Sequence, residues 1–285
     1  MAVKTIVSRG NLSAAHSSSN RLWSPNIWHD CPWVAIREGT VAGVAFEDDF
    51  ASFPKTPATT EGNWGQYAQF SSTGGTITAG TGQGGEAVFA SDDDNEGASI
   101  RTLSTPFKII RTAKKFWFEA RVKVSTIADT KFGMFLGLMQ NVALTATVPI
   151  AADGTLADTN LVGFHRLEGD GDYVDTVYKA DGVTAVTVGT DAKVLVADTY
   201  VKLGMVFEPA ADPLIHDPAQ TGVNKYVLSF YADNLKLADH KQIPSAAGTD
   251  FPNDVSMGLV FAVLNAAGSS PGNATIDGWR AAQLL

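Results

Sequence analysis

A strict alternation of apolar and polar residues runs through residues 114–125, Lys-Lys-Phe-Trp-Phe-Glu-Ala-Arg-Val-Lys-Val-Ser. Phe116 and Phe118 fall on one side of this pattern, and Glu119 and Arg121 fall on the other. A period of two residues is typical of a strand with one face in the core, whereas a helix would scatter the same apolar groups around its axis. The stretch therefore predicts a long inner strand of an antiparallel sheet.

Shorter apolar stretches predict further strands, and Gly-rich turns separate the early ones. The body of the chain begins at residues 44–50, and the expected strands lie at residues 64–70, 76–79, 86–91, 98–103, 107–110, 132–139, 160–167, 173–178, 184–188, 200–207, 225–232, 256–264 and 275–281. Residues 141–159, 209–222 and 239–253 are expected to be long loops, the first of them at the surface. No stretch predicts a long amphipathic helix, so the pattern favours an all-β sandwich or barrel.

Composition narrows the classes of partner. The chain has 285 residues, 45% hydrophobic residues and a formal net charge of −9, which fits one large sandwich and argues against nucleic acid or an anionic membrane as the main partner. No uninterrupted apolar run approaches the ~20 residues of a membrane span, and the N-terminus lacks an apolar core for secretion. Cys31 is the single cysteine, so we expect no internal disulfide and synthesis in a reducing host cytoplasm.

Residues 1–43 differ in kind from the rest and predict an extended N-terminal arm in front of a sandwich at residues 44–285. Three tryptophans lie within eleven positions, and two prolines interrupt any helix or inner strand between them. One interpretation is that the tryptophans pack back onto the chain's own sandwich. The other is that the arm crosses to another subunit, where its aromatic and basic side chains make the contact. The contact residues would be Arg9, Arg21, Trp23, Trp28, Trp33 and Arg37.

Five segments in chain order resemble the strands of concanavalin A/laminin-G-type jelly rolls. They are Phe-Trp-Phe-Glu-Ala-Arg-Val-Lys-Val (116–124), Lys-Phe-Gly-Met-Phe-Leu-Gly-Leu-Met (131–139), Tyr-Val-Lys-Leu-Gly-Met-Val-Phe (200–207), Tyr-Val-Leu-Ser-Phe-Tyr-Ala-Asp (226–233) and Ala-Thr-Ile-Asp-Gly-Trp-Arg-Ala (274–281). The resemblance implies an antiparallel jelly-roll β-sandwich over roughly residues 44–285. It concerns strands rather than a catalytic signature, so it bears on fold more than on function.

A second resemblance concerns residues 22–50, with Leu-Trp-Ser, Asp-Cys-Pro-Trp, Glu-Gly and Phe-Glu-Asp-Asp-Phe in that order. Followed by such a sandwich, this arm is similar to structural proteins in the head modules of tailed bacteriophages. The resemblance implies a non-enzymatic decoration or cement protein on the outer surface of the virion's capsid. Its partners would be the major capsid protein lattice and further copies of the same chain, commonly as a trimer.

Catalytic motifs are absent from the sequence. Jelly-roll glucanases that resemble this fold carry a Glu-x-Asp-x-Glu set on one inner strand, whereas here Glu119 is followed by Arg121 and Lys123. Alternate residues of a strand share a face, so these three side chains predict an ion network across strands. The chain has no Gly-x-Ser-x-Gly and no phosphate-binding loop, and Cys31 has no evident base partner. We predict no catalytic residue, no cofactor and a chain that is not an enzyme.

Two acidic loops, residues 92–96 and 168–172, have the oxygen-rich composition of calcium sites. Neither completes a known calcium motif, so solvated acidic turns are the expectation and calcium binding is the alternative. His29-Asp30-Cys31 lacks a second pair of ligands at zinc-finger spacing. His165 falls within an expected strand and is predicted to be a partly buried, hydrogen-bonded histidine. We therefore predict no metal site.

Two alternatives to a capsid protein stay open. The first is a carbohydrate-binding, lectin-like module in which Trp117 stacks on a sugar ring, with Glu119 and Arg121 on the same face of the strand. The second is a receptor-binding or fibre subunit, although the sequence carries no long repetitive or coiled-coil shaft. The glycan-binding alternative can be tested by the single substitution Trp117→Ala, which should abolish selective glycan binding.

Overall fold

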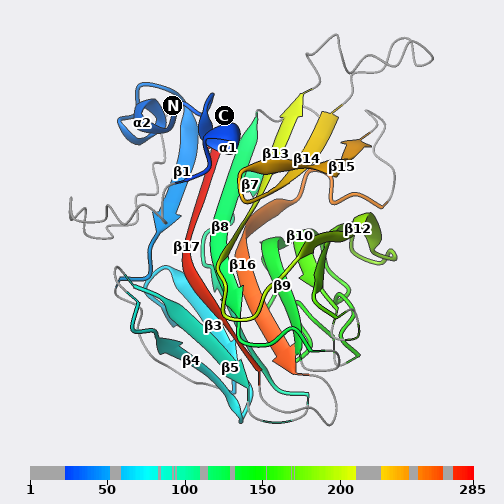
Figure 1. Cartoon of the computed structure of the whole chain (residues 1–285). Helices are drawn as coiled ribbons and strands as arrows, with labels where there is room; N and C mark the ends of the chain where they lie inside the picture. The colour runs from blue at the N-terminus through cyan, green and yellow to red at the C-terminus, as the bar shows by residue number, and fades with distance from the viewer. Residues whose placement is uncertain are drawn as a thin grey trace.

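The computed structural model describes residues 23–51, 59–82, 85–91, 93, 95–109, 115–128, 132–151, 153–167, 169, 171–209, 226–243, 250–265 and 272–285. Two short helices and seventeen strands lie in these residues (Figure 1). They are α1 (Pro25–Trp28), α2 (Trp33–Arg37), β1 (Gly43–Asp48), β2 (Gly62–Trp64), β3 (Tyr67–Ser71), β4 (Gly75–Ala79), β5 (Ala87–Ser91), β6 (Gly97–Thr102), β7 (Phe107–Lys108), β8 (Phe116–Val124), β9 (Phe132–Gln140), β10 (Leu161–Arg166), β11 (Tyr173–Lys179), β12 (Val186–Val194), β13 (Val201–Pro209), β14 (Tyr226–Ala232), β15 (Leu235–Ile243), β16 (Ser256–Asn265) and β17 (Gly272–Leu284). Neither of these helices has the length and apolar character that a membrane span requires.

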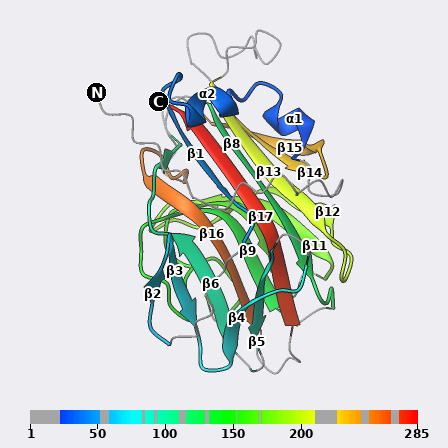
Figure 2. The ribbon, with the colours of Figure 1, turned by 90° about the vertical axis from the view of Figure 1, so that its left-hand side faces the viewer.

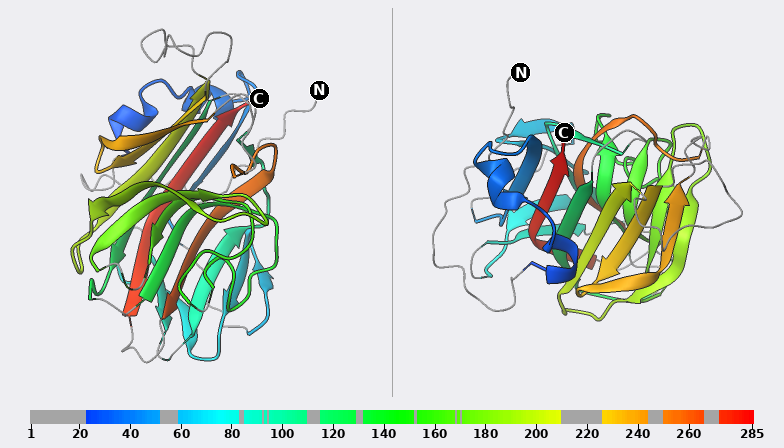
Figure 3. Two further views of the ribbon diagram at one scale, coloured as in Figure 1. Left: turned by 90° about the vertical axis from the view of Figure 1, so that its right-hand side faces the viewer. Right: turned by 90° about the horizontal axis from the view of Figure 1, so that it is seen from above.

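The strands form two antiparallel sheets that pack face to face (Figure 3). Sheet A has the order β15-β14-β13-β8-β17-β5-β4, with β1 also paired to β17. Sheet B has the order β12-β11-β10-β9-β16-β6-β3-β2, with β7 also paired to β16. Neighbours in a sheet are often far apart in sequence, as where β17 lies between β8 and β5. The predicted antiparallel jelly-roll β-sandwich is confirmed.

The predicted organising strand is β8, which lies between β13 and β17 in sheet A. Its residues Phe116, Phe118 and Val122 are fully buried and belong to the main core between the sheets. Sheet B contributes residues such as Leu136 and Phe261 to the same core. The period-two pattern therefore predicted correctly which face of this strand lies in the main core.

The outer face of sheet B is covered by residues 141–159, which the sequence predicted as a surface loop. Leu144, Ile150 and Leu156 of this segment are buried and pack in one cluster with Phe135 of β9. Strands that are apolar on both faces need a cover on each side. The loop supplies that cover, so its apolar residues are packed rather than exposed.

Among the described residues, the outer face of sheet A is covered at one end only. Residues 23–42, called here the N-terminal cap, lie over the upper part of β1, β8 and β13, and neither of the two described helices covers the lower part of β8 and β17 (Figure 2). Ile27 and Ile36 of the cap are buried in a cluster with Trp117 and Val206. A side chain at Gly204 would collide with Ile27, since an added Cβ would lie 2.4 Å from its Cδ1 atom. Sheet A is thus shaped to receive the cap.

Candidate functional site

Glu119 of β8 is the main polar anchor of the N-terminal cap. Its carboxylate accepts hydrogen bonds from the Ser24 backbone N–H at 2.9 Å, from the Ser24 hydroxyl, and from the Trp28 indole N–H at 2.7 Å. The side chain is fully buried. Burial raises the pKa of Glu119, and the hydrogen bonds from Ser24 and Trp28 oppose that shift. A buried carboxylate with several donors is costly to leave unpaired, so this group fixes the start of the cap.

Arg280 of β17 lies beside Glu119 in the pairing of β17 with β8, and beside Glu47 in the pairing of β17 with β1. Its guanidinium lies 3.7 Å from the ring centroid of Trp33 and 4.4 Å from that of Trp28. Burial lowers the pKa of Arg280 to about 10, against the opposing effect of Glu47. The cation is thus held between carboxylates of the sheet and aromatic rings of the cap.

The three cap tryptophans form an edge-to-face series and are all half-buried. The ring centroids are 6.5 Å apart for Trp23 and Trp28, and 5.6 Å apart for Trp28 and Trp33. Trp23 donates its indole N–H to Glu47 of β1 at 2.9 Å. Arg37 belongs to α2 and lines a small surface depression with Trp33. The three tryptophans contact the chain's own sandwich, which is the first of the two interpretations left open for the arm. Arg9 and Arg21 lie outside the described residues.

The predicted glycan face around Trp117 is closed. Trp117 is only 1% exposed, and its indole N–H donates to Asp30 of the cap at 3.0 Å. Asp30 also pairs with Lys115 at 2.6 Å. Neither Trp117 nor Glu119 can therefore contact a ligand while the cap is in place, because the cap occupies their side of the sheet. Arg121 lies beyond the cap and is partly exposed.

An open depression of about 530 Å³ lies where the cap meets the β14–β15 turn. It is lined by Trp23, Ser24, Pro25, Lys202, Asp233 and Asn234, and is called here the Trp23 depression. Its lining offers an indole ring beside a carboxylate, an amide and an ammonium group. These are the kinds of group that define a small-molecule site. The sequence analysis did not identify Lys202, Asp233 or Asn234 as site residues.

Asp233 and Asn234 form the two-residue turn between β14 and β15, and both have positive φ angles, of 48° and 68°. Asp and Asn tolerate this conformation, which two-residue hairpin turns require. The Asp233 carboxylate accepts from the Lys202 backbone N–H at 3.0 Å. Asn234 accepts from the Asn26 backbone N–H at 2.8 Å, which ties the turn to the cap. The Asp-Asn pair directly after the expected strand at residues 225–232 was a sequence signal for this turn, but the strand that follows it, β15, was not predicted.

Burial shifts the pKa of both Cys31 and His165, which the sequence analysis considered for nucleophilic chemistry and metal binding. Burial raises the pKa of Cys31 to about 12, which disfavours its reactive thiolate form. His165 is buried, and its pKa is lowered to about 4 by burial. In the part of the chain that the structure describes, no group of three or more His, Cys, Asp or Glu residues could hold a metal ion. Both acidic loops lie partly outside that part.

No family model matches this sequence, and no curated protein matches it either. Several solved structures are similar in fold. An endo-acting O-glycanase of human gut bacteria, reported to initiate mucin breakdown, has a TM-score of 0.50 at 11% identity, covering 84% of this chain and 99% of that one. A legume lectin-like domain from Entamoeba histolytica has a TM-score of 0.46 at 11% identity, covering 76% and 89%. A Bacteroides ovatus glucanase solved with a glucan product has a TM-score of 0.49 at 14% identity, covering 83% and 99%.

The likeness to the O-glycanase overturns the prediction that this chain is not an enzyme. The same jelly roll carries mucin-degrading enzymes, so neither the fold nor its strand pattern argues against catalysis. The missing Glu-x-Asp-x-Glu set excludes only one arrangement of carboxylates on one strand. At 11% identity the likeness shows the fold and nothing finer.

Proposed function

We propose that this chain is a carbohydrate-binding, lectin-like module, and that a glycan binds in the Trp23 depression. Two observations support the proposal. The fold is one that a mucin-degrading O-glycanase also has, and the depression combines an indole ring with Lys202, Asp233 and Asn234. The second observation carries the proposal, because it concerns this chain's own side chains.

A sugar ring presents two kinds of surface, and the depression offers a partner for each. The C–H groups on one side of the ring are apolar and stack on an aromatic side chain such as Trp23. The hydroxyl groups both donate and accept hydrogen bonds. Asp233 can accept them, the Lys202 ammonium can donate, and the Asn234 amide can do both.

The lining is held in place by contacts within the chain. Trp23 is held by Glu47, and Asn234 by Asn26. Lys193 forms an ion pair with Asp233 at 2.8 Å. A site whose walls are already ordered loses less entropy when it binds, which favours recognition of weakly held ligands such as sugars.

The test is a glycan array followed by calorimetric titration of the selected oligosaccharide. In the variant Trp23→Ala, affinity should fall about five- to thirtyfold, since stacking and ring burial contribute on the order of 1–2 kcal/mol. In Trp23→Phe, most of the affinity should remain, because an aromatic ring is kept while the hydrogen bond to Glu47 is lost.

Trp64 provides the matched control. It is 40% exposed and lies on β2 at the edge of sheet B, so Trp64→Ala should leave glycan affinity unchanged. If Trp64→Ala lowered affinity as much as Trp23→Ala, or if no glycan bound the wild-type chain, the Trp23 depression would not be a glycan site.

The capsid role stays a prediction from sequence. It places a trimer of this chain on the major capsid protein lattice at the virion surface, through an arm whose tryptophans contact another subunit. Trp23, Trp28 and Trp33 contact the chain's own sheet instead. Contact with another subunit would therefore use the exposed parts of these half-buried rings or residues 1–22.

A further inference from the structure

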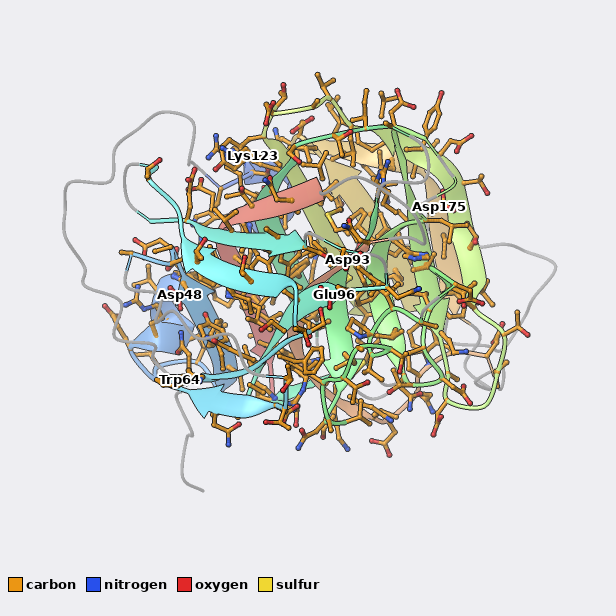
Figure 4. All side chains as sticks on the ribbon, turned by 90° about the horizontal axis from the view of Figure 1, so that it is seen from below. Asp48, Trp64, Asp93, Glu96, Lys123 and Asp175 are labelled. Carbon is orange, nitrogen blue, oxygen red and sulfur yellow. The ribbon has the colours of Figure 1, made fainter. Side chains whose placement is uncertain are left out.

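Below the cap, the outer face of sheet A carries a group of cations around one tyrosine. Arg121 and Lys123 alternate on β8 and so share a face. Lys202 of β13 lies opposite Arg121 in the strand pairing, and Tyr200 immediately precedes β13. These four residues are called here the basic strip. Figure 4 shows Lys123 well apart from Trp64 at the edge of the other sheet.

Tyr200 organises the strip. The Arg121 guanidinium lies 3.7 Å from the centroid of its ring, and the Lys123 ammonium lies 4.7 Å from it. Its hydroxyl donates to the Glu86 carboxylate. Contacts of the two cations with the aromatic ring hold them close together despite their like charge.

The carboxylates that balance these cations lie underneath them. Asp277 pairs with Arg121, and their side chains are 2% and 16% exposed. Glu86 lies 3.9 Å from Lys123, and their side chains are 11% and 29% exposed. Asp277 is placed there by a β-bulge in β17, where the register with β8 shifts between Ile276 and Gly278. The outward-facing ends are therefore the positive ones.

A cationic surface is a local exception on a chain with a net charge of −9. At physiological ionic strength, charges more than about 8 Å apart are largely screened in solvent. The strip's own three cations and the two partner carboxylates, Asp277 and Glu86, therefore decide which ligand binds it, and more distant carboxylates contribute little.

The strip continues from the Trp23 depression. Lys202 lines that depression and also lies opposite Arg121, so one oligosaccharide can reach both. Guanidinium and ammonium groups bind carboxylates and sulfates through charge-assisted hydrogen bonds. We propose that the basic strip is a subsite for an acidic sugar residue, carrying a carboxylate or a sulfate, of a glycan that also occupies the Trp23 depression. This proposal rests on the proposed function.

The experiment titrates the full chain with pairs of glycans that differ only in the acidic group. The pairs are oligogalacturonate with its methyl ester, sialyllactose with its methyl ester, and chondroitin sulfate oligosaccharide with its desulfated form. At least one acidic member should bind about tenfold tighter than its partner. The preference should shrink severalfold in Lys123→Gln and as salt is raised. Which pair responds tells carboxylate from sulfate.

The variants are chosen so that a folding defect cannot be mistaken for the result. Arg121→Gln would leave the buried Asp277 without its cation, so Lys123→Gln, at a more exposed position, is the principal variant. Lys108→Gln is the control, because the Lys108 side chain is 45% exposed, pairs with Asp254 and lies on β7 in sheet B. Two results would contradict the proposed acidic-sugar subsite: equal binding of both members of every pair, or an acid preference that Lys123→Gln leaves unchanged. Neither result would contradict the proposed glycan site in the Trp23 depression. Absence of binding by all six glycans, while a glycan from the array still binds, would overturn the basic strip alone.

Discussion

At the scale of single residues, His165 shows how burial changes the chemistry that a sequence suggests. It lies on β10 with 8% of its surface exposed, and its Nε2 atom lies 3.0 Å from the carbonyl oxygen of Gly154. The alternation of residues 161–167 predicted a partly buried, hydrogen-bonded histidine. What could not be predicted is the element above it, since Gly154 belongs to a loop whose position depends on tertiary packing.

The lowered pKa of His165 predicts a dependence of stability on pH. The folded chain takes up the proton only near pH 4, whereas the unfolded chain takes it up near 6.5. The free energy of unfolding should therefore fall between pH 6.5 and 4, by up to about 3 kcal/mol. Urea denaturation at several pH values measures this for the wild type and for His165→Asn, which cannot titrate. Parallel pH profiles for the two chains would contradict the assignment.

At the scale of elements, β8 and the N-terminal cap mark the limits of sequence reasoning. The alternation in β8 was enough to identify a strand and its buried face, because the pattern is local. The cap was different, since nothing local decides whether half-buried tryptophans pack on their own chain or on another. The predicted loop at residues 239–253 was wrong at its start, because β15 pairs with β14 as far as Ile243. Polar residues such as those of β15 are tolerated on an edge strand.

The anchoring role of Glu119 predicts that Glu119→Gln loosens the cap. A neutral amide is a weaker acceptor than a carboxylate, and it places N–H groups against the donors of Ser24 and Trp28. The loss should be about 2 kcal/mol of cap docking, seen as faster proteolysis within residues 23–42 and red-shifted tryptophan fluorescence. Glu38→Gln, at an exposed position of the same cap, should change neither. Equal protease resistance of both variants would contradict the anchoring role.

At the scale of the whole molecule, the C-terminal residue, directly after β17 of sheet A, meets the last residue of the N-terminal cap. The Leu285 backbone N–H donates to the carbonyl oxygen of Ala42 at 3.1 Å, and Figure 1 shows the C-terminus beside the cap. The cap closes the upper part of this face and leaves the Trp23 depression and the basic strip beside it. The sequence predicted the sandwich but placed the glycan face at Trp117, because alternation tells which side of a sheet a residue is on and not what lies over it.

The most direct measurement is a structure of the full chain with the oligosaccharide that it binds best. A sugar ring should lie within about 4 Å of the Trp23 indole, and an acidic substituent should lie beside Lys123 and Arg121. A saccharide bound at any other place on the sandwich, with Trp23 and the basic strip uncovered, would contradict the account.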